Sequence, residues 1–79
     1  MIINVTYFGQ LTEIAGGRSE SITLNGSTIA CLLEQVGNEK PELNDKIFAI
    51  FLNNQKVSEY EHVLQHNDEI CLMPPFAGG

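Results

Sequence analysis

Apolar and polar residues alternate in three stretches of the chain, and this spacing of two is typical of half-buried β-strands. The three stretches are also rich in β-branched and aromatic side chains, which pack well on a pleated sheet. The pattern predicts strands at residues 2–8, 19–24 and 69–73, whose inward side chains are Ile3, Val5, Tyr7, Ile22, Leu24, Ile70 and Leu72. We expect the first two strands to be antiparallel neighbours.

Residues 47–52 (IFAIFL) are continuously apolar instead of alternating. Such a run predicts a central strand that is covered on both faces. The following Asn53-Asn54 predicts a turn, and Lys56-Val57 predicts the beginning of a short returning strand.

One stretch has the period of a helix. Ile29, Leu32, Leu33 and Val36 follow the i, i+3, i+4, i+7 spacing, and Ser27 or Thr28 can cap the helix before them. We expect this helix to end near Gly37-Asn38, because Pro41 prevents its continuation. Residues 10–15 predict a second, short helix that Gly16-Gly17 stops.

The predicted order of elements is two strands, a helix, and then two or three strands. For so short a chain this order favours an α+β fold, in which one main helix packs across a mixed sheet of four to five strands. It matches the β-grasp (ubiquitin-like) topology. We therefore expect a β-grasp domain over residues 1–75, followed by a flexible C-terminal tail at residues 76–79.

Composition narrows the possible functions. Ten acidic residues against four basic ones give a net charge of −6, which argues against nucleic-acid binding. No apolar run approaches the roughly 20 residues that span a membrane, and the N-terminus lacks the basic region of a signal peptide. These features predict a single cytoplasmic domain without a membrane partner.

Side chains that could perform catalysis are scarce. His62 and His66 are four residues apart, but no third metal ligand accompanies them, so we expect surface histidines and no metal site. Cys31 and Cys71 form no metal-binding motif and are expected to be free thiols. An acyl carrier protein is rejected, because that class needs a helical bundle and a serine in an Asp-Ser-Leu context. We expect no enzyme activity from the chain on its own.

The end of the sequence, Pro74-Pro75-Phe76-Ala77-Gly78-Gly79, has the strongest functional pattern. Two prolines fix the backbone angle φ and stiffen the beginning of the tail. Two glycines without Cβ atoms can pass through a channel too narrow for any side chain. A free carboxylate on such a thread suits activation by another enzyme. The alternative is a frayed chain end, which the preceding Pro-Pro-Phe makes less attractive.

An apolar surface is predicted beside the tail. On the outward face, the first strand carries Phe8 and the last strand carries Cys71 and Met73. If the two strands are neighbours, these side chains form a patch of the kind that binds partner proteins. The alternative for Phe8 is that it packs under the helix at residues 10–15.

The tail and the β-grasp order together resemble the small sulfur-carrying subunits of molybdopterin synthase, the MoaD family within the MoaD/ThiS ubiquitin-like sulfur carriers. The resemblance covers essentially the whole chain. The Pro-Pro-x-x-Gly-Gly end is its most specific part. Supporting matches are Tyr7-Phe8-Gly9-Gln10, Leu52-Asn53 and Asn67-Asp68-Glu69-Ile70. Phe76 and Asn67 depart from the family pattern, in which a smaller β-branched residue and a glycine are more usual.

The resemblance implies a chemistry for Gly79. An E1-like adenylyltransferase would use ATP to adenylate its carboxylate, and a sulfur donor protein would convert the adenylate into a thiocarboxylate. The tail, with Phe76, Ala77 and Gly78 threading behind Gly79, would then deliver sulfur to precursor Z in the large synthase subunit. Two small and two large subunits would form a heterotetramer, and no cofactor would be tightly bound to this chain.

The same resemblance leaves alternatives. The chain could carry sulfur for thiamine or tRNA thiolation, or it could be a ubiquitin-like modifier of other proteins. It could also be an interaction module with an inert tail. Thiazole carriers tend to be shorter than this chain and usually lack Pro-Pro before the tail. This difference favours the molybdenum pathway.

Overall fold

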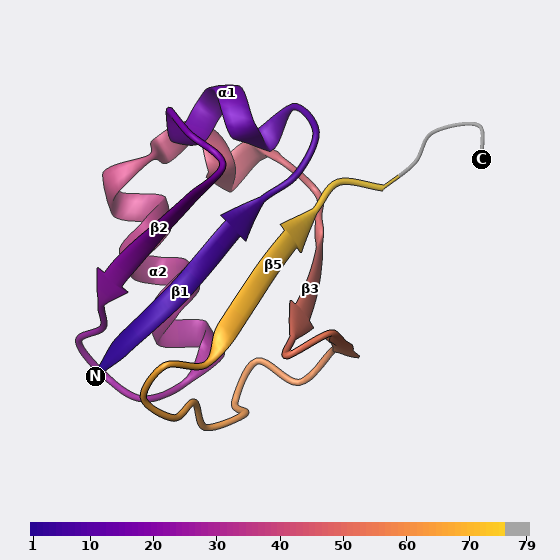
Figure 1. The fold of residues 1–79 in the computed structure, drawn as a ribbon. Coiled ribbons are helices and arrows are strands. Elements are labelled where there is room, and N and C mark those ends of the chain that lie inside the picture. Colours follow the sequence, from indigo (N-terminus) through magenta and orange to yellow (C-terminus); the bar gives the residue numbers. More distant parts are fainter. Residues whose placement is uncertain (76–79) are drawn as a thin grey trace.

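The computed structural model describes residues 1–75 (Figure 1). This part of the chain contains five strands, one long helix and two short helical segments. In chain order the elements are β1 (Ile2–Tyr7), α1 (Leu11–Ala15), β2 (Ser19–Thr23), α2 (Ile29–Glu39), the 3-10 helix η1 (Pro41–Asp45), β3 (Ala49–Leu52), β4 (Gln55–Val57) and β5 (Glu69–Met73).

The five strands form one mixed sheet in the order β2-β1-β5-β3-β4 (Figure 1). β1 and β2 are antiparallel, as predicted, while β1 and β5 run parallel and place Thr6 opposite Cys71. β5 is antiparallel to β3, which in turn pairs with the short edge strand β4. The first and last strands therefore lie side by side in the middle of the sheet, as the predicted β-grasp fold requires.

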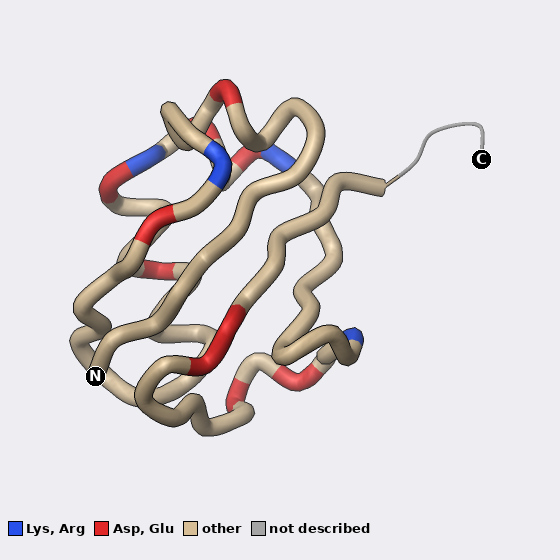
Figure 2. The backbone as a smooth tube through the Cα atoms, viewed as in Figure 1, with Lys and Arg blue, Asp and Glu red and all other residues tan. Residues whose placement is uncertain are grey.

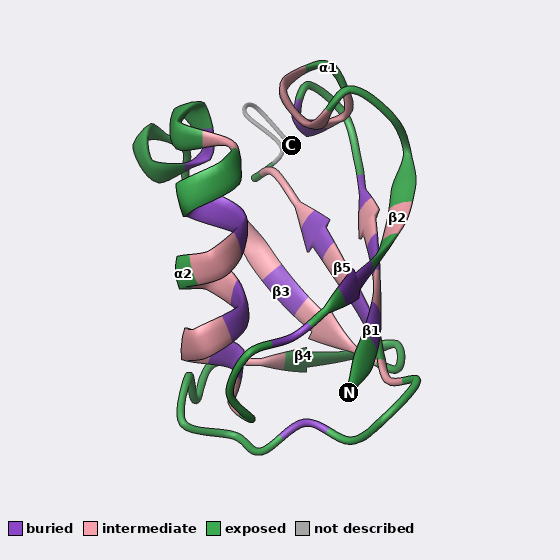
Figure 3. Ribbon diagram, turned by 90° about the vertical axis from the view of Figure 1, so that its left-hand side faces the viewer, coloured by how far each residue is buried: buried purple, intermediate pink, exposed green. Residues whose placement is uncertain are grey.

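The core lies between α2 and one face of the sheet, which we call the inner face (Figure 3). Every second residue of β1 and β5 points into this layer, so the pattern read from the sequence is confirmed there. α2 contributes its buried stripe, and Leu64 closes the layer from the connection before β5. The core side chains that are at most 1% exposed are Ile3, Val5, Leu11, Ile29, Leu32, Leu64, Ile70 and Leu72.

The main helix begins as predicted but ends later. The Thr28 hydroxyl accepts a hydrogen bond from the Cys31 N–H and so caps α2. The helix ends at Glu39, one residue beyond the predicted end near Gly37-Asn38. Gly37 does not cap the helix. It is buried against Asn44 of η1, whose side-chain amide donates to the Gly37 carbonyl at 3.3 Å.

One polar group of side chains lies at the edge of the inner face. Tyr7 donates its hydroxyl to Glu20 Oε2 at 2.5 Å, and Lys40 Nζ lies 2.8 Å from the same oxygen. This contact ties the end of α2 to β1 and β2. Burial of Glu20 works against ionisation, but the hydrogen bonds from Lys40 and Tyr7 outweigh it and lower the pKa of the carboxyl group.

Asparagines supply the left-handed backbone at two turns. Asn53 and Asn54 have φ values of 49° and 72° between β3 and β4, and Asn67 has a φ of 71° before β5. The Asn53 side chain also accepts the Glu69 N–H at 3.0 Å and donates to Asp68 at 3.2 Å. The turn after β3 is thereby tied to the start of β5. The described residues include no helix long and apolar enough to cross a membrane.

Candidate functional site

The tail leaves the sheet from the end of β5. Pro74 directly follows Met73 and is half-buried, while Pro75 is exposed. Both prolines lie beside the start of α1 and the segment before β3, where they share a surface hollow with Gln10, Leu11 and Ile47 among others. The predicted tail residues Phe76, Ala77, Gly78 and Gly79 lie outside the described part of the chain. Their roles stay predictions.

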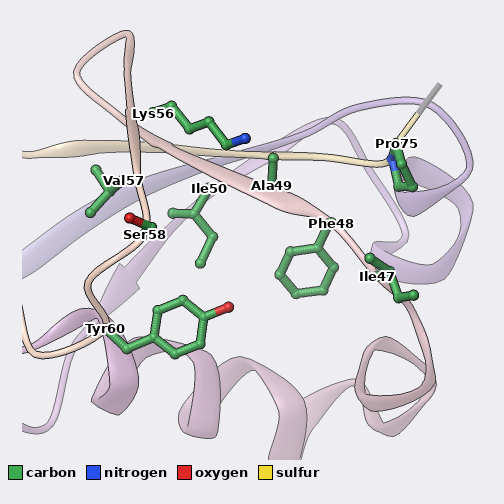
Figure 4. A pocket seen from close by; sticks show the side chains of 9 residues that line it. All are labelled: Ile47, Phe48, Ala49, Ile50, Lys56, Val57, Ser58, Tyr60 and Pro75. Atoms are coloured by element: carbon green, nitrogen blue, oxygen red, sulfur yellow. The ribbon is translucent and has the colours of Figure 1, made fainter. Parts of the chain in front are cut away.

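A second hollow adjoins the same exit point. It has a volume of about 320 Å³ and lies at the edge of the sheet, between β3, β4 and Tyr60 (Figure 4). Its lining includes the rings of Phe48 and Tyr60, with Ile47 and Pro75 at one end. Ile47 is 81% exposed, an unusual position for so large an apolar side chain. The exit of the tail therefore has apolar surface on the side of this hollow, while Asp45 and Lys46 line the first hollow.

The structure brings Phe8, Cys71 and Met73 to one face of adjacent strands. This outer face of the sheet is opposite the one that α2 covers (Figure 3). Cys71 lies opposite Thr6, and the Phe8 N–H continues the ladder by donating to the Leu72 carbonyl at 3.1 Å. Phe8 is 38% exposed, so its side chain is not buried under α1. Cys71 and Met73 are half-buried beside it.

β3 adds two residues to this surface that were not predicted from the sequence. Ala49 pairs with Met73 and Phe51 pairs with Cys71, so both side chains lie on the outer face. The prediction that β3 is covered on both faces is therefore wrong: Ile50 is buried on the inner face, whereas Ala49 and Phe51 are only half-buried. The continuous apolar run at residues 47–52 was the feature of the sequence that could have indicated these two outer-face residues. The outer patch consists of Phe8, Ala49, Phe51, Cys71 and Met73.

Polar residues bound the outer patch away from the tail. Asn4 lies opposite both Ser21 and Glu69, and the Ser21 hydroxyl donates to the Asn4 side chain at 2.9 Å. Figure 2 shows the acidic start of β5 at this end, while the half of β1 and β5 nearer the tail carries no charge. On the other side, Lys56 of β4 lies opposite Phe51. The apolar part of the outer face is thus the part next to the tail.

The two thiols have different surroundings. Burial, with a smaller effect from Glu69, raises the pKa of the Cys71 thiol, so this side chain stays neutral and contributes apolar surface. Cys31 lies in the first turn of α2, where hydrogen bonds involving the Thr28 side chain, and backbone hydrogen bonds at Thr28 and Ser27, lower the pKa of its thiol. Both cysteines are free, as predicted.

The histidines do not form a common site. His62 and His66 lie in the connection between β4 and β5, where the structure has no helix. His66 accepts the Ile2 N–H at 3.0 Å through Nδ1 and so helps to hold the start of β1. Within residues 1–75, no group of three histidine, cysteine or acidic side chains could hold a metal ion.

Comparison with known sequences agrees with this architecture. The ThiS family model matches residues 5–79. The chain is 34% identical to the human molybdopterin synthase sulfur carrier subunit, over 98% of this chain and 93% of that protein. It is 31% identical to the protein of the same name from Mycobacterium tuberculosis, over 98% and 96% of the two chains.

Solved structures show the same fold. A putative molybdopterin converting factor subunit 1 from Pyrococcus furiosus superimposes with a TM-score of 0.88 at 22% identity, over 96% of this chain and 99% of that one. In Helicobacter pylori, a complex of subunits 1 and 2 of molybdopterin-converting factor contains a chain that matches with a TM-score of 0.74 at 26% identity, over the full length of both chains. With a family match that begins in β1 and extends to Gly79, this chain belongs to the ThiS family.

Proposed function

We propose that this protein is the sulfur carrier subunit of a molybdopterin synthase and that it acts in molybdenum cofactor biosynthesis. The observation that carries the proposal is the similarity of nearly the whole chain to relatives named molybdopterin synthase sulfur carrier subunit. Family membership supports a sulfur-carrier role. The finer chemistry is inferred from the Pro-Pro-x-x-Gly-Gly end.

In the proposed reaction, the Gly79 carboxylate is first made electrophilic. A carboxylate with a pKa near ~3.5 is ionised at neutral pH and resists attack by a nucleophile. Its oxygen attacks the α-phosphorus of ATP on an E1-like enzyme, and pyrophosphate leaves. A sulfide-level nucleophile from the donor protein then displaces AMP, which leaves a thiocarboxylate on Gly79.

The sulfur is then delivered inside the large synthase subunit. The tail enters the partner's site, and the thiocarboxylate gives its sulfur to precursor Z. Hydrolysis returns the Gly79 carboxylate, so the chain can be loaded again. The catalytic side chains belong to the partners, and this chain supplies the reacting terminus and the body that holds it.

The outer patch is the proposed docking surface for both partners. It is apolar, lies beside the exit of the tail and contains an exposed phenylalanine, which is the type of residue that anchors protein interfaces. Both partners need to grip the same body to reach the same terminus, so we expect them to compete. The complex of two subunits from Helicobacter pylori supports a large subunit as one partner. The other proposed partners are the E1-like enzyme and the sulfur donor protein. The proposed synthase is a heterotetramer of two small and two large subunits.

Intact mass spectrometry tests the proposal. The protein is incubated with ATP, the activating enzyme and the sulfur donor, and the expected product is heavier by the difference between one sulfur and one oxygen atom. Addition of the large subunit and precursor Z should return the original mass and yield molybdopterin. A variant with one residue added after Gly79 should fold normally and stay unmodified, because the reacting carbonyl is displaced by a residue length. Full activity of that variant would refute the carrier role of Gly79.

A protein modifier is the second candidate. The small archaeal modifier protein 1 from Methanosarcina acetivorans has a TM-score of 0.84 to this chain at 25% identity, over 99% of this chain and 96% of that one. A modifier would form isopeptide bonds through the same adenylate. Conjugates of this chain with lysine side chains in cell extracts would favour this role, whereas a thiocarboxylate alone favours the synthase.

A further inference from the structure

The turn between β1 and α1 contains a glycine with a left-handed backbone. Gly9 has a φ of +59°, a conformation that side chains disfavour. The turn is held by two hydrogen bonds, since the Phe8 carbonyl accepts the Leu11 N–H at 3.2 Å and the Gly9 carbonyl accepts the Thr12 N–H at 3.1 Å. The backbone at Gly9 therefore has a fixed position relative to the sheet.

Gly9 also lies against the first residue of the tail. A Cβ atom on Gly9 would be 3.0 Å from Cγ of Pro74 and 3.7 Å from its Cδ. Gly16 offers an internal comparison, because it has a φ of +80° and no atom within 4 Å of its added Cβ. Both glycines satisfy a left-handed turn, but only Gly9 provides the bare backbone against which the half-buried Pro74 packs.

We propose that Gly9 is a positioning residue, which sets the direction in which the tail leaves the sheet through its contact with Pro74. The inference rests on the proposed function, since the direction of the tail matters only if its end reacts in a partner. The ring of Pro74 is rigid, so a Cβ at residue 9 displaces the tail at its root. Five residues separate Pro74 from the end of Gly79 and can extend about 17 Å. For a tail that is fully extended in a partner's site, a rotation of about 10° at the root would move the reacting carbonyl by about 3 Å.

The matched variants Gly9→Ala and Gly16→Ala test the proposal. Each is prepared with a Gly79 thiocarboxylate by thiolysis of an intein thioester, so that the activating enzyme is not needed. Sulfur transfer to precursor Z is then followed in a single turnover at saturating large subunit. Both variants place an alanine at a positive φ, so both melting temperatures should fall, and that of Gly9→Ala should fall further because its Cβ also meets Pro74. Only Gly9→Ala should lose transfer rate, by roughly tenfold or more, with a Kd within about twofold of the parent's.

A double-mutant cycle with Pro74→Ala isolates the contact. The alanine lacks the Cγ and Cδ atoms that a Cβ on residue 9 would meet. In this background, Gly9→Ala should lower the transfer rate by less than about twofold, because interacting residues are not additive. An equal loss in both backgrounds would overturn the proposal, as would parental transfer by Gly9→Ala in the Pro74 background.

A spectroscopic readout separates this inference from the proposed function. The ¹³C chemical shifts of Pro74 and Pro75 should change in Gly9→Ala and stay unchanged in Gly16→Ala. If these shifts are the same in both variants, Gly9 does not position the tail, whether or not the parent transfers sulfur. If the shifts respond as expected and the parent transfers no sulfur, the contact stands as an orienting contact and the proposed function fails.

Discussion

The two faces of the sheet are built from the same strands but differ in what their apolar residues do. Leu72 and Met73 are consecutive residues of β5. Leu72 points into the inner face and is 1% exposed, whereas Met73 points to the outer face and is half-buried. On the inner face, α2 covers the apolar side chains and makes them a core. On the outer face, no helix within residues 1–75 covers the apolar side chains near the tail (Figure 3). Folding therefore accounts for the first set, and the second set is available for binding.

The largest expected effect is on the inner face. Leu72→Ala removes a fully buried side chain and leaves a cavity, so the free energy of unfolding should fall by about 3 kcal/mol. The folded molecules should keep the parent's affinity for both partners. Urea unfolding and a binding titration below the transition provide the two measurements. A loss of affinity in the folded fraction would mean that the two faces are not independent.

Met73→Glu tests the neighbouring residue on the outer face. A charge buried without a partner at an interface is costly, whereas the same charge on a free surface costs almost nothing. Binding to the activating enzyme and to the large subunit should weaken by about 2 kcal/mol, or about thirtyfold in Kd, at an unchanged melting temperature. Ser21→Glu, on the polar part of the outer face, is the control and should bind normally. If Met73→Glu melts far below the parent while its folded fraction binds normally, Met73 belongs to the core.

Phe51→Ser tests how far the outer patch extends across β3. Phe51 lies opposite Cys71 but one strand further from Phe8, so we expect a smaller loss of affinity, about 1 kcal/mol or fivefold in Kd. Isothermal titration with the large subunit measures it. Unchanged affinity for both partners would limit the docking surface to β1 and β5.

The smallest effect concerns the polar edge of the inner face. The folded state lowers the pKa of Glu20, so its ionised carboxylate contributes stability above its unfolded pKa of about 4.5. This contribution is lost as the pH falls through the lower pKa of the folded state. Glu20→Gln should therefore be slightly less stable than the parent at pH 7, and the difference should vanish at low pH. The urea midpoints of both proteins between pH 7 and pH 2.5 measure this difference in stability. A difference that does not change with pH would mean that the charge of Glu20 does not contribute to stability.

The sequence predicted the structure best in strands that have one buried face and one exposed face, because the alternation of apolar and polar residues shows this directly. Alternation in residues 2–8 and 69–73 predicted β1 within one residue and β5 at its observed bounds. It was less informative where a residue's role depends on a contact with another element of the fold. Gly37 looked like a helix end, but its missing side chain lets Asn44 approach the helix. The residues around Gly37 contain no pattern that predicts this contact.

The same distinction applies to the candidate site. Phe8, Cys71 and Met73 could be placed together because two alternating strands determine which side chains share a face. Phe51 was missed because a continuous apolar run does not show which of its faces a helix will cover. The contact between Gly9 and Pro74 joins the ends of two parallel strands that are far apart in the sequence. Only the pairing of β1 with β5 reveals it.

The central place of β5 also determines when the domain can fold during synthesis. In the sheet, β1 pairs with β2 and β3 pairs with β4, and β5, the last strand of residues 1–75, joins the two pairs. A nascent chain that stops after β4 contains α2 and two strand pairs that β5 has not yet joined into one sheet, and isolated strand pairs are marginally stable. Closure of the sheet requires contacts between the first and last strands, which are slow to form because the intervening loop is long. An incomplete product therefore stays open to proteases, and only a chain that includes β5 forms the body from which the tail projects.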